Sequence, residues 1–460
     1  MKYYKRESYL KKIRGFYNDT EIIKVITGVR RCGKSSLMLT IAKELEENGV
    51  LKENIIYFDL DKRGYRSIKT PDQLEKLIED NIKVEGLKYL FIDEVQNVTD
   101  FEEVLNGFRD EGDISIFITG SNSYLLSGEL ITKLTGRYIE FEMFPLNFQE
   151  YLGMKAFLKK NINQNLVQEF DNYLMEGGFP KAVQYDSLQD KKTYVTGVIS
   201  EIFQKDIKRR VKIRNVSVFQ KIQQYLINNF GATTSLTNML EALEKDGTKI
   251  KRETLNNYIK ILCDAKILYE CSRFDLKSKK SIAGEKKYYL SDLGFYYSTN
   301  TDNRINYGPV MENVAYVYAR SNDYSVSVGR IGKLECDFIL RKDIDYAYLQ
   351  ICMTIMSSPE TEEREYKPLE SIKDNYPKYV LTRSDPIQHR NELREGSHPR
   401  CEATDELLSM IDVLVEGRFV LAQKDISLKF RGSRNQRIVD MNKTREAGEI
   451  ILWDEGKRGM

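Results

Sequence analysis

Histidine is almost absent from this sequence, and its scarcity limits the chemistry open to the chain. Only two of the 460 residues are histidines, His389 and His398, and both lie near the C-terminal end. A reaction that rests on a histidine base, or a metal site built from several histidines, is therefore disfavoured. The six cysteines are scattered and form no Cys-x-x-Cys pair, which in a chain of this length indicates reduced thiols of the cytoplasm.

Long apolar runs and an excess of one charge are also missing. No uninterrupted apolar stretch approaches the roughly 18 residues that a membrane helix needs, and the start MKYYKRESYLKK lacks the apolar core of a signal peptide. The 71 Lys and Arg against 69 Asp and Glu give a net charge of +2, which excludes a histone-like or acidic-tail protein. We therefore expect a cytoplasmic protein without a membrane partner, in which basic patches are local.

Tyrosine is missing from the end of the chain. All 29 tyrosines lie in residues 1–382, whereas a uniform density would place about six in residues 383–460. The single tryptophan and both histidines lie in this tail. The composition therefore breaks near residue 383, and 383–460 is left as an unassigned charged tail. One hypothesis is an extension of separate origin, such as a shifted reading frame or a fused segment; the alternative is an ordinary tail with unusual counts.

The first 145 residues show a regular alternation of apolar and amphipathic segments. Nearly continuous apolar runs predict strands covered on both faces of a parallel sheet, at 22–28, 54–61, 89–95 and 114–121. Helix-like segments, including 36–47 and 71–81, lie between them. This pattern predicts an α/β fold. Because 460 residues are too many for one core, we expect about three domains in all.

A glycine-rich motif follows the first predicted strand and opens a helix. Residues 28–35 match GxxxxGK[ST], whose backbone N–H groups wrap a β-phosphate at the positive end of the helix dipole. Lys34 is expected to reach the β- and γ-phosphates, and the Ser35 hydroxyl to bind Mg²⁺. A glycine-rich turn that binds nothing is the alternative. The candidate ATP-binding residues of this loop are Gly28, Arg30, Arg31, Cys32, Gly33, Lys34, Ser35 and Ser36.

An acidic pair ends the third predicted strand, where Asp93 and Glu94 follow an apolar run. We expect Asp93 to hold Mg²⁺ through water and Glu94 to polarise the water that attacks the γ-phosphate. Alone, such a pair is more often a solvated strand end. Together with the phosphate loop it favours hydrolysis over simple nucleotide binding. After the fourth strand, Asn122 is placed to sense the γ-phosphate, although ordinary turn chemistry explains it equally well.

Five motifs, in this order and spacing, resemble one family. GVRRCGKSSL, YLFIDEVQN, ITGSNSYLL, LTGRYIEFEMFPL and EGGFP are similar to those of the large prokaryotic family of AAA-type ATPases, in which the ATPase precedes a C-terminal domain of no agreed function. The resemblance spans residues 1–382 and implies an AAA-type P-loop core over 1–145 and a helical lid over 146–212. It makes Arg137 a candidate charge-stabilising arginine, acting in cis or on a neighbouring copy in a homo-oligomer; a surface salt bridge is the alternative.

A basic region follows at 213–300. Helices predicted at 216–233 and 234–265 precede a strand–tip–strand pattern, and residues 272–287 hold six basic residues against two acids. This order favours a winged-helix domain whose wing lies on a phosphate backbone. A solvated hairpin used only in protein packing is the alternative. The candidate DNA contacts are Arg252, Asn256, Asn257, Lys277, Lys279 and Lys280.

The region 301–382 resembles the restriction-endonuclease-like fold. Glu312 lies on a predicted helix, Asp337 on a strand and Gln350 on the next strand, in the spacing of that fold's metal site. Cys352 occupies the position of the usual lysine, and Gln350 replaces an acid. We therefore expect a degenerate α/β domain in which the fold persists while the nuclease chemistry is lost.

These observations predict an ATPase that uses ATP and Mg²⁺ and couples hydrolysis to a conformational change acting on DNA or on a protein partner. Two other functions stay open. One is a DNA-acting ATPase linked to a nuclease, and the other is a nucleotide-dependent switch that does not hydrolyse ATP.

Overall fold

The structure, a computed structural model, describes residues 3–120, 136–208, 211–300 and 304–383, together with residue 385 and the stretches 413–416, 437–447 and 450–452. The chain divides into two compact units, Met1–Asp385 and Pro386–Met460. Among the described residues, no helix is both long enough and apolar enough to cross a membrane.

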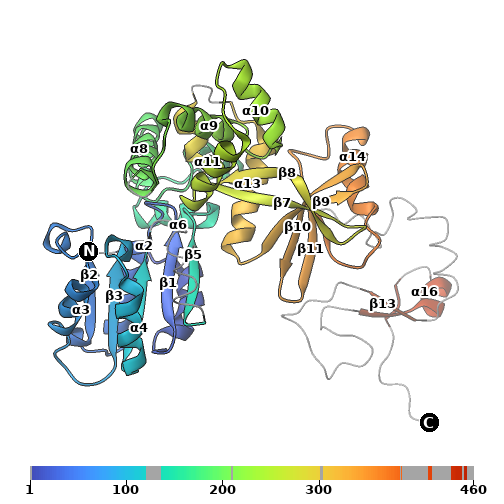
Figure 1. Cartoon of the computed structure of the whole chain (residues 1–460). Coiled ribbons are helices and arrows are strands. Elements are labelled where there is room, and N and C mark those ends of the chain that lie inside the picture. Colours follow the sequence, from blue (N-terminus) through green and yellow to red (C-terminus); the bar gives the residue numbers. More distant parts are fainter. Residues whose placement is uncertain are drawn as a thin grey trace, which may run out of the picture. The chain divides into compact units, whose positions relative to one another are not determined.

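A five-stranded sheet opens the first unit. Its strands are β1 (Ile23–Gly28), β2 (Ile55–Asp59), β3 (Lys88–Asp93), β4 (Ile114–Thr119) and β5 (Tyr138–Met143). They lie in the order β2-β3-β4-β1-β5, and every neighbouring pair is parallel (Figure 1). All residues of β1, β3 and β4 are buried, so the parallel sheet predicted from continuous apolar runs is confirmed.

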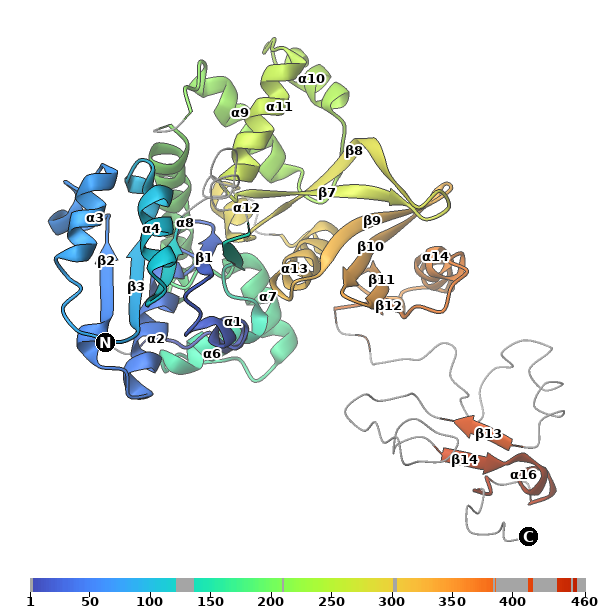
Figure 2. The same cartoon turned by 60° about the horizontal axis from the view of Figure 1, so that its bottom comes forward.

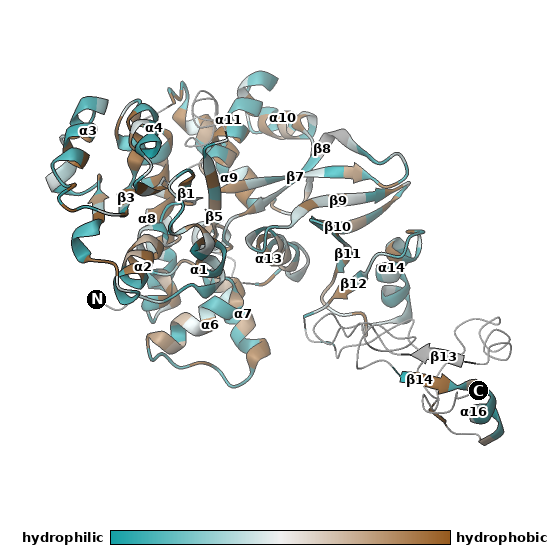
Figure 3. Cartoon of the chain, turned by 90° about the horizontal axis from the view of Figure 1, so that it is seen from below, coloured by the Kyte–Doolittle hydropathy of each residue, from teal (hydrophilic) through white to brown (hydrophobic). Residues whose placement is uncertain are grey.

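Helices cover both faces of this sheet. On one face, α3 (Pro71–Glu79) and α4 (Phe101–Glu111) bury Leu74 and Leu105 against the strands. On the other face, α2 (Lys34–Glu47) buries apolar side chains that include Leu37, Met38 and Ile41. Short α1 (Glu7–Ile13) joins the same cluster. Figure 3 shows the strand β1 as largely hydrophobic and much of the visible surface of α3 and α4 as hydrophilic.

A helical region connects this sheet to the rest of the unit. It contains α6 (Phe148–Phe157), α7 (Leu166–Glu176) and α8 (Leu188–Glu201), and a π-helix at Ile202–Ile207 continues α8 directly. The region begins at a capping box, because the Asn147 side chain accepts a hydrogen bond from the backbone of the third helical residue, which returns one. The sequence prediction of helices here is therefore confirmed.

Three helices and three strands follow in the order helix, strand, helix, helix, strand, strand. They are α9 (Val216–Asn228), β6 (Thr233–Thr234), α10 (Leu236–Lys245), α11 (Arg252–Asp264), β7 (Leu268–Asp275) and β8 (Lys280–Leu290). The helix expected at 234–265 is two helices, because the chain turns at Gly247, whose φ of 76° is a left-handed conformation that favours glycine after a helix end.

A second, mixed sheet contains strands from both sides of residue 300. Its order is β12-β11-β10-β9-β7-β8-β6, and β7 pairs in parallel with β9, so β7 and β8 continue into the later strands (Figure 2). Helix α12 precedes the later part, α13 packs on the sheet, and α14 contacts β11. The bounds are α12 Gly294–Thr299, α13 Tyr307–Ser321, β9 Ser325–Ile331, β10 Leu334–Lys342, β11 Asp345–Ile351, α14 Pro359–Glu370 and β12 Lys378–Leu381.

The second unit, Pro386–Met460, contains a small antiparallel pair. β13 (Val413–Glu416) pairs with β14 (Arg437–Asp440), and α16 (Met441–Ala447) follows directly. Within its described residues, Ile438, Val439 and Met441 are buried.

Candidate nucleotide-binding site

The phosphate loop lies where the sequence places it, between the end of β1 and the start of α2. Gly28 has a φ of 139°, and a Cβ there would stand 2.1 Å from the Met143 carbonyl oxygen of β5. Only glycine therefore lets the chain leave β1 at this point. Gly33, with a φ of 114°, precedes the first residue of α2 in a second conformation that favours glycine.

The basic and hydroxyl side chains of the loop occupy the start of α2. Lys34 is buried, and its Nζ donates to the carbonyl oxygens of Gly28 at 2.9 Å and Val29 at 3.2 Å, so the ammonium points into the loop. Ser35 and Ser36 are exposed in the first turn of the helix. A phosphate held here would face these hydroxyls and the unpaired backbone N–H groups of the helix N-terminus.

The acidic pair stands at the same edge of the sheet, at the end of β3. Asp93 is buried, and its carboxylate accepts hydrogen bonds from the hydroxyls of Thr119 and, at 3.3 Å, Tyr57. Glu94 has a φ of 57°, an uncommon conformation for a residue other than glycine, which is held by a hydrogen bond from its backbone N–H to Thr119 Oγ1 at 3.0 Å. Strands on either side of β3 therefore fix both acids.

Burial and charge act on Glu94 in opposite directions. Loss of solvent raises the pKa of this carboxyl above its usual value, while the nearby cations Lys34 and Arg30 oppose the shift. The Gln96 side-chain amide donates to the same carboxylate. A carboxyl with a raised pKa is a better proton acceptor in its ionised form than an ordinary surface acid, as general-base catalysis requires.

A cavity of about 800 Å³ connects these groups. Its lining includes a polar part, formed by the loop with Asp93 and Glu94, and a part with many apolar side chains, which we call its polar end and its apolar end. The apolar end comes from the N-terminal segment and the helical region, which the motifs did not identify. Its lining includes Tyr4, Leu146, Met154, Phe157, Leu158 and Pro180. A cavity of this size, with convergent polar groups at one end, is typical of a small-molecule site.

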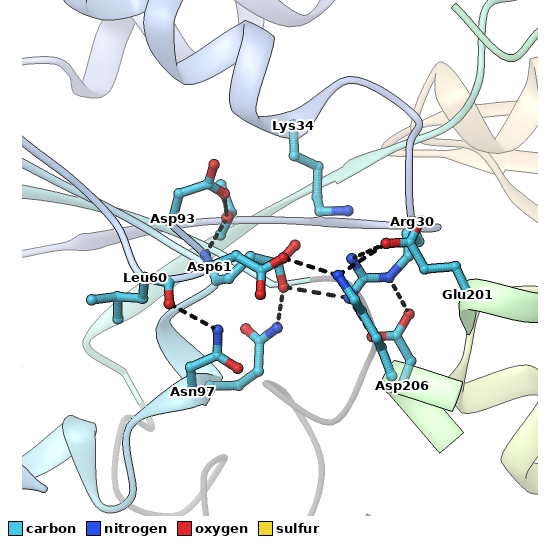
Figure 4. A network of polar contacts seen from close by, with 12 residues as sticks. Arg30, Lys34, Leu60, Asp61, Asp93, Asn97, Glu201 and Asp206 are labelled. Carbon is cyan, nitrogen blue, oxygen red and sulfur yellow. Dashed lines mark hydrogen bonds and ion pairs between the residues drawn. The ribbon is translucent and has the colours of Figure 1, made fainter. Parts of the chain in front are cut away.

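Arg30 connects the loop to the helical region. Its guanidinium forms two hydrogen bonds of 2.8 Å with the Asp206 carboxylate, on the π-helix. It also lies 3.7 Å from a Glu201 oxygen and 4.0 Å from a Glu94 oxygen (Figure 4). Arg31 projects to the surface, with 53% of its side chain exposed, and pairs with Glu201 at 3.0 Å. Asp206 and Glu201 carry no motif, so the sequence analysis missed them.

Two predicted residues of the site stand apart from this group. Asn122 lies outside the described residues. Arg137 is exposed and its carbonyl accepts from the Ile23 N–H, at the start of β1. Because β1 and β5 run in parallel, Arg137 sits at the opposite edge of the sheet from the phosphate loop. This position, at the far ends of the strands from the loop, gives no support to a role in cis, and both roles expected for Arg137 stay predictions.

The residues expected to contact DNA are all exposed. Arg252, Asn256 and Asn257 are exposed on α11, which buries Leu255 and Ile259 in the core. Lys277, Lys279 and Lys280 are exposed at and beside the turn between β7 and β8.

Two other basic residues of that stretch, Arg273 on β7 and Lys287 on β8, are buried within the second sheet domain. Arg273 pairs with Glu335, and Lys287 Nζ lies 3.0 Å from carboxylate oxygens of both Glu335 and Glu312. We call Glu312, Glu335 and Asp337 the acidic cluster. Arg273 of β7 and Lys287 of β8 therefore balance carboxylate charges of the acidic cluster within the fold.

The expected vestigial nuclease residues do come together around this cluster. Glu312 accepts from Lys287 and, at 2.9 Å, from the Tyr289 hydroxyl. Asp337 accepts from the Ile351 N–H at 2.7 Å, and burial followed by the Glu312 charge raises its pKa to about 8. Gln350 donates to Glu365 at 3.1 Å. Within the described residues, no group of three or more His, Cys, Asp or Glu side chains has an arrangement that could hold a metal ion.

Three families match separate parts of the chain. An AAA domain matches residues 20–152, which contain the phosphate loop and the acidic pair. A domain of unknown function matches residues 167–304, and a 4Fe-4S single cluster domain matches residues 388–439. Such clusters are held by four cysteine thiolates. Residues 388–439 contain only Cys401, so the side chains present do not fit the cluster.

The chain is also similar to solved structures and to curated proteins. The Walker-type ATPase of Pyrococcus abyssi is 16% identical with a TM-score of 0.47, covering 64% of this chain and 95% of that one. AMPPCP-bound DnaA from Aquifex aeolicus is 16% identical with a TM-score of 0.29, covering 57% and 88%. An uncharacterized protein of Methanocaldococcus jannaschii is 30% identical over 380 residues, which are 79% of this chain and 83% of that protein.

An uncharacterized protein of Haemophilus influenzae is 32% identical over 379 residues, which are 82% of this chain and 92% of that protein. The residues matched by the AAA domain include the phosphate loop and the acidic pair. The chain therefore belongs to the family of AAA-domain P-loop proteins that includes these bacterial and archaeal relatives.

Proposed function

We propose that this protein binds ATP with Mg²⁺ and hydrolyses it, and that hydrolysis drives a conformational change acting on DNA or on a protein partner. The observation that supports the proposal is the polar end of the 800 Å³ cavity, where Lys34, Ser35, Asp93 and Glu94 converge. The cavity's apolar end offers a surface for a nucleobase, and its polar end offers N–H groups, an ammonium and hydroxyls for phosphates.

Each of these side chains has a task in the reaction. Lys34 would exchange its contacts with the Gly28 and Val29 carbonyls for phosphate oxygens. The Ser35 hydroxyl and, through water, Asp93 would hold Mg²⁺, which neutralises charge that develops on the phosphates. Glu94 would accept the proton of the attacking water, since Thr119 holds its backbone N–H and the Gln96 amide donates to its carboxylate at the cavity wall.

A phosphate-release assay with Mg²⁺, in the presence and absence of duplex DNA, tests this function. Release of phosphate that depends on Lys34 supports an ATPase. Tight ATP binding without release would instead identify a non-hydrolytic switch. Stimulation by DNA would connect the reaction to the basic region at 213–300.

DNA contact is a second candidate, and the order of elements from α9 to β8 supports it. Helix, strand, helix, helix, strand and strand is the order of a winged-helix domain, with α11 in the position of the groove-reading helix and the β7–β8 turn as the wing. Arg252, Asn256 and Asn257 are exposed on α11, and three lysines are exposed at the wing.

The wing lysines give a direct test of DNA contact. Replacing Lys277, Lys279 and Lys280 together by alanine should weaken duplex binding and reduce the slope of log affinity against log salt by about 3, roughly one unit per lost phosphate contact. Fluorescence anisotropy at several salt concentrations measures both quantities. Lys76→Ala, at an exposed lysine of α3, is the control; an equal loss there would show that the effect is general charge.

Nuclease activity is the third candidate. Glu312, Asp337 and Gln350 have a spacing that resembles the metal site of a restriction-endonuclease-like fold, but Cys352 stands in place of its lysine and Gln350 in place of an acid. We propose an inactive scaffold. Plasmid incubated with Mg²⁺ or Mn²⁺ should stay intact, and cleavage that disappears in Asp337→Ala would contradict this proposal.

A further inference from the structure

We propose that the ion pair between Arg30 and Asp206 is a latch that fastens the phosphate loop to the helical region and opens when a γ-phosphate is bound. The proposal rests on the nucleotide binding proposed above and adds a route by which the state of the nucleotide reaches the elements after residue 213.

The pair itself is buried and geometrically specific. Arg30 is 8% exposed and Asp206 is 5% exposed, although the two residues are 176 positions apart in the chain. Both carboxylate oxygens of Asp206 accept from the guanidinium at 2.8 Å. A two-point contact between a planar guanidinium and a carboxylate fixes orientation as well as distance. The loop and the π-helix are therefore held in one relative position.

A bound triphosphate would compete for this arginine. Arg30 lines both the large cavity and a neighbouring polar cavity of about 200 Å³, to which Asp206, Glu94 and Lys205 also contribute. A γ-phosphate placed beside Glu94 would attract the same guanidinium and repel the carboxylates around it. Movement of the guanidinium toward the phosphate would lengthen its two hydrogen bonds with Asp206, and so weaken this contact.

The π-helix that carries Asp206 is held by further charge pairs. Lys205 lies 3.1 Å from Asp61, after β2, and 3.0 Å from Glu201. Glu201 in turn pairs with Arg31. A π-helix is rare and is found mostly at functional sites, because its wider turn places side chains where an α-helix would not. Lys205 and Asp206 of this helix thus line the smaller polar cavity together with Arg30.

The other end of this route is the contact between α8 and α12. Gly294, the first residue of α12, lies against Val195 of α8, so close that a Cβ there would be 3.5 Å from Val195 Cγ2. Asp292, just before α12, accepts hydrogen bonds from the N–H groups of Gly294 at 2.7 Å and Gly178 at 2.6 Å. A shift of α8 therefore moves α12, and β8 of the second sheet directly precedes it.

Hydrogen–deuterium exchange of the full chain tests the latch. With a non-hydrolysable ATP analogue and Mg²⁺, exchange of the segments Ile202–Ile207 and Gly294–Thr299 should become faster. Asp206→Asn keeps the shape of the side chain but removes its charge. This variant should exchange roughly tenfold faster in both segments without any nucleotide, and the analogue should add little.

Asp186→Asn is the matched control. Asp186 belongs to the same region, pairs with Lys160 at 2.8 Å on the surface, and is not among the residues that line the two cavities. Its exchange should equal that of the unchanged protein, with and without the analogue. Fast exchange in this variant as well would mean that charge loss anywhere loosens the region, which overturns the latch.

Equilibrium dialysis of the analogue on the same samples separates two failures. Absence of binding contradicts the proposed function, and the comparison of Asp206→Asn with the unchanged protein then still decides whether the pair holds α12. Tight binding with unchanged exchange at Ile202–Ile207 overturns the latch and leaves the proposed function intact. Fast exchange of Asp206→Asn confined to Ile202–Ile207 overturns the route to α12.

The second unit contains too few cysteines for the cluster of its matched family. We infer that Pro386–Met460 is a unit of different origin from the ATPase and that it does not assemble a 4Fe-4S cluster. Its matched family covers 388–439, beyond the AAA domain, and the unit boundary at Asp385 coincides with the end of the tyrosines. With one cysteine, the matched segment lacks three of the four thiolates that such a cluster uses.

The remaining cysteines are poorly suited to replace them. All five lie in Met1–Asp385, and Cys32 is fully buried in the phosphate loop. Burial raises the pKa of the other four thiols to about 12, and the thiolate is the form that binds metal. These four are Cys263, Cys271, Cys336 and Cys352.

Anaerobic reconstitution of the full chain with ferrous iron and sulfide tests this inference. After removal of unbound iron, the protein should show no visible absorption band of a cluster and an iron content equal to that of Cys401→Ser. Four irons per chain that are lost in Cys401→Ser would overturn it.

Discussion

The phosphate site and the acidic cluster use similar groups with different results. Each combines carboxylates with a buried lysine. At the phosphate site, Lys34 donates to two backbone carbonyls, and Asp93 and Glu94 border a large cavity. In the acidic cluster, Lys287 is already paired with Glu312 and Glu335. Acids beside a lysine therefore indicate a reaction site only where the lysine remains available to a ligand.

The largest effect should come from Lys34→Ala. Loss of the ammonium removes the one lysine that the loop offers to the β- and γ-phosphates, so ATP affinity should fall at least about 100-fold. Isothermal titration calorimetry with Mg²⁺ and ATP measures this, with Lys76→Ala as the control. Unchanged affinity would mean that the phosphate loop does not bind the triphosphate and would remove the difference between the two sites.

Glu94→Gln should separate binding from turnover. The amide keeps the size of the side chain but cannot accept a proton from water, so ATP should still bind while phosphate release falls by about 10³-fold. Calorimetry and a phosphate-release assay on one preparation check both. Normal hydrolysis in this variant would show that Glu94 is not the base.

Lys287→Ala should affect stability rather than ATP binding. Removing the cation leaves the partly buried Glu312 and Glu335 near each other without their shared partner, which should cost about 2 kcal/mol of unfolding free energy. Chemical denaturation measures the change, and Lys286→Ala, at the less buried neighbouring lysine, is the control. Reduced ATP affinity with unchanged stability would contradict the structural role assigned to this lysine.

Replacing Asp337 should have a smaller effect on the free energy of unfolding, and this effect should depend on pH. Its folded pKa, about 8, lies above the ordinary value near 4, so the folded state binds the proton more tightly. The stability that this tighter proton binding adds to the folded state is fully present below about pH 4 and is lost as pH rises to about 8. Asp337→Asn mimics the protonated form and should be more stable than the unchanged protein at pH 8, with equal stability near pH 4. Denaturation midpoints of both proteins at both pH values check this. A difference between the two midpoints that is the same at pH 4 and pH 8 would contradict it.

The pattern of apolar residues along the sequence was sufficient to predict the strands of the first sheet. The apolar runs at 22–28 and 114–121 became β1 and β4 to within two residues, because strands covered on both faces need continuous apolar sequence. The phosphate loop was equally predictable, since Gly28 and Gly33 meet backbone requirements that few other residues satisfy.

Partners distant in the chain were not predictable. The six basic residues of 272–287 appeared as one wing, yet Arg273 and Lys287 turn inward to the acidic cluster while Lys277 and Lys279 are exposed. Arg137 was expected near the nucleotide, and strand direction placed it at the opposite edge of the sheet. Alternation along a strand sets the face on which a side chain lies, but pairing with another strand decides what that face meets.

The sequence by itself determined the α/β core, the phosphate loop, the acidic pair and the break in composition near residue 383. Only the tertiary structure decided which charges are available to a ligand and which are neutralised within the fold. Arg30 and Asp206 illustrate the reason: they are 176 positions apart, no motif links them, and their pairing arises only when the end of α8 packs beside the phosphate loop.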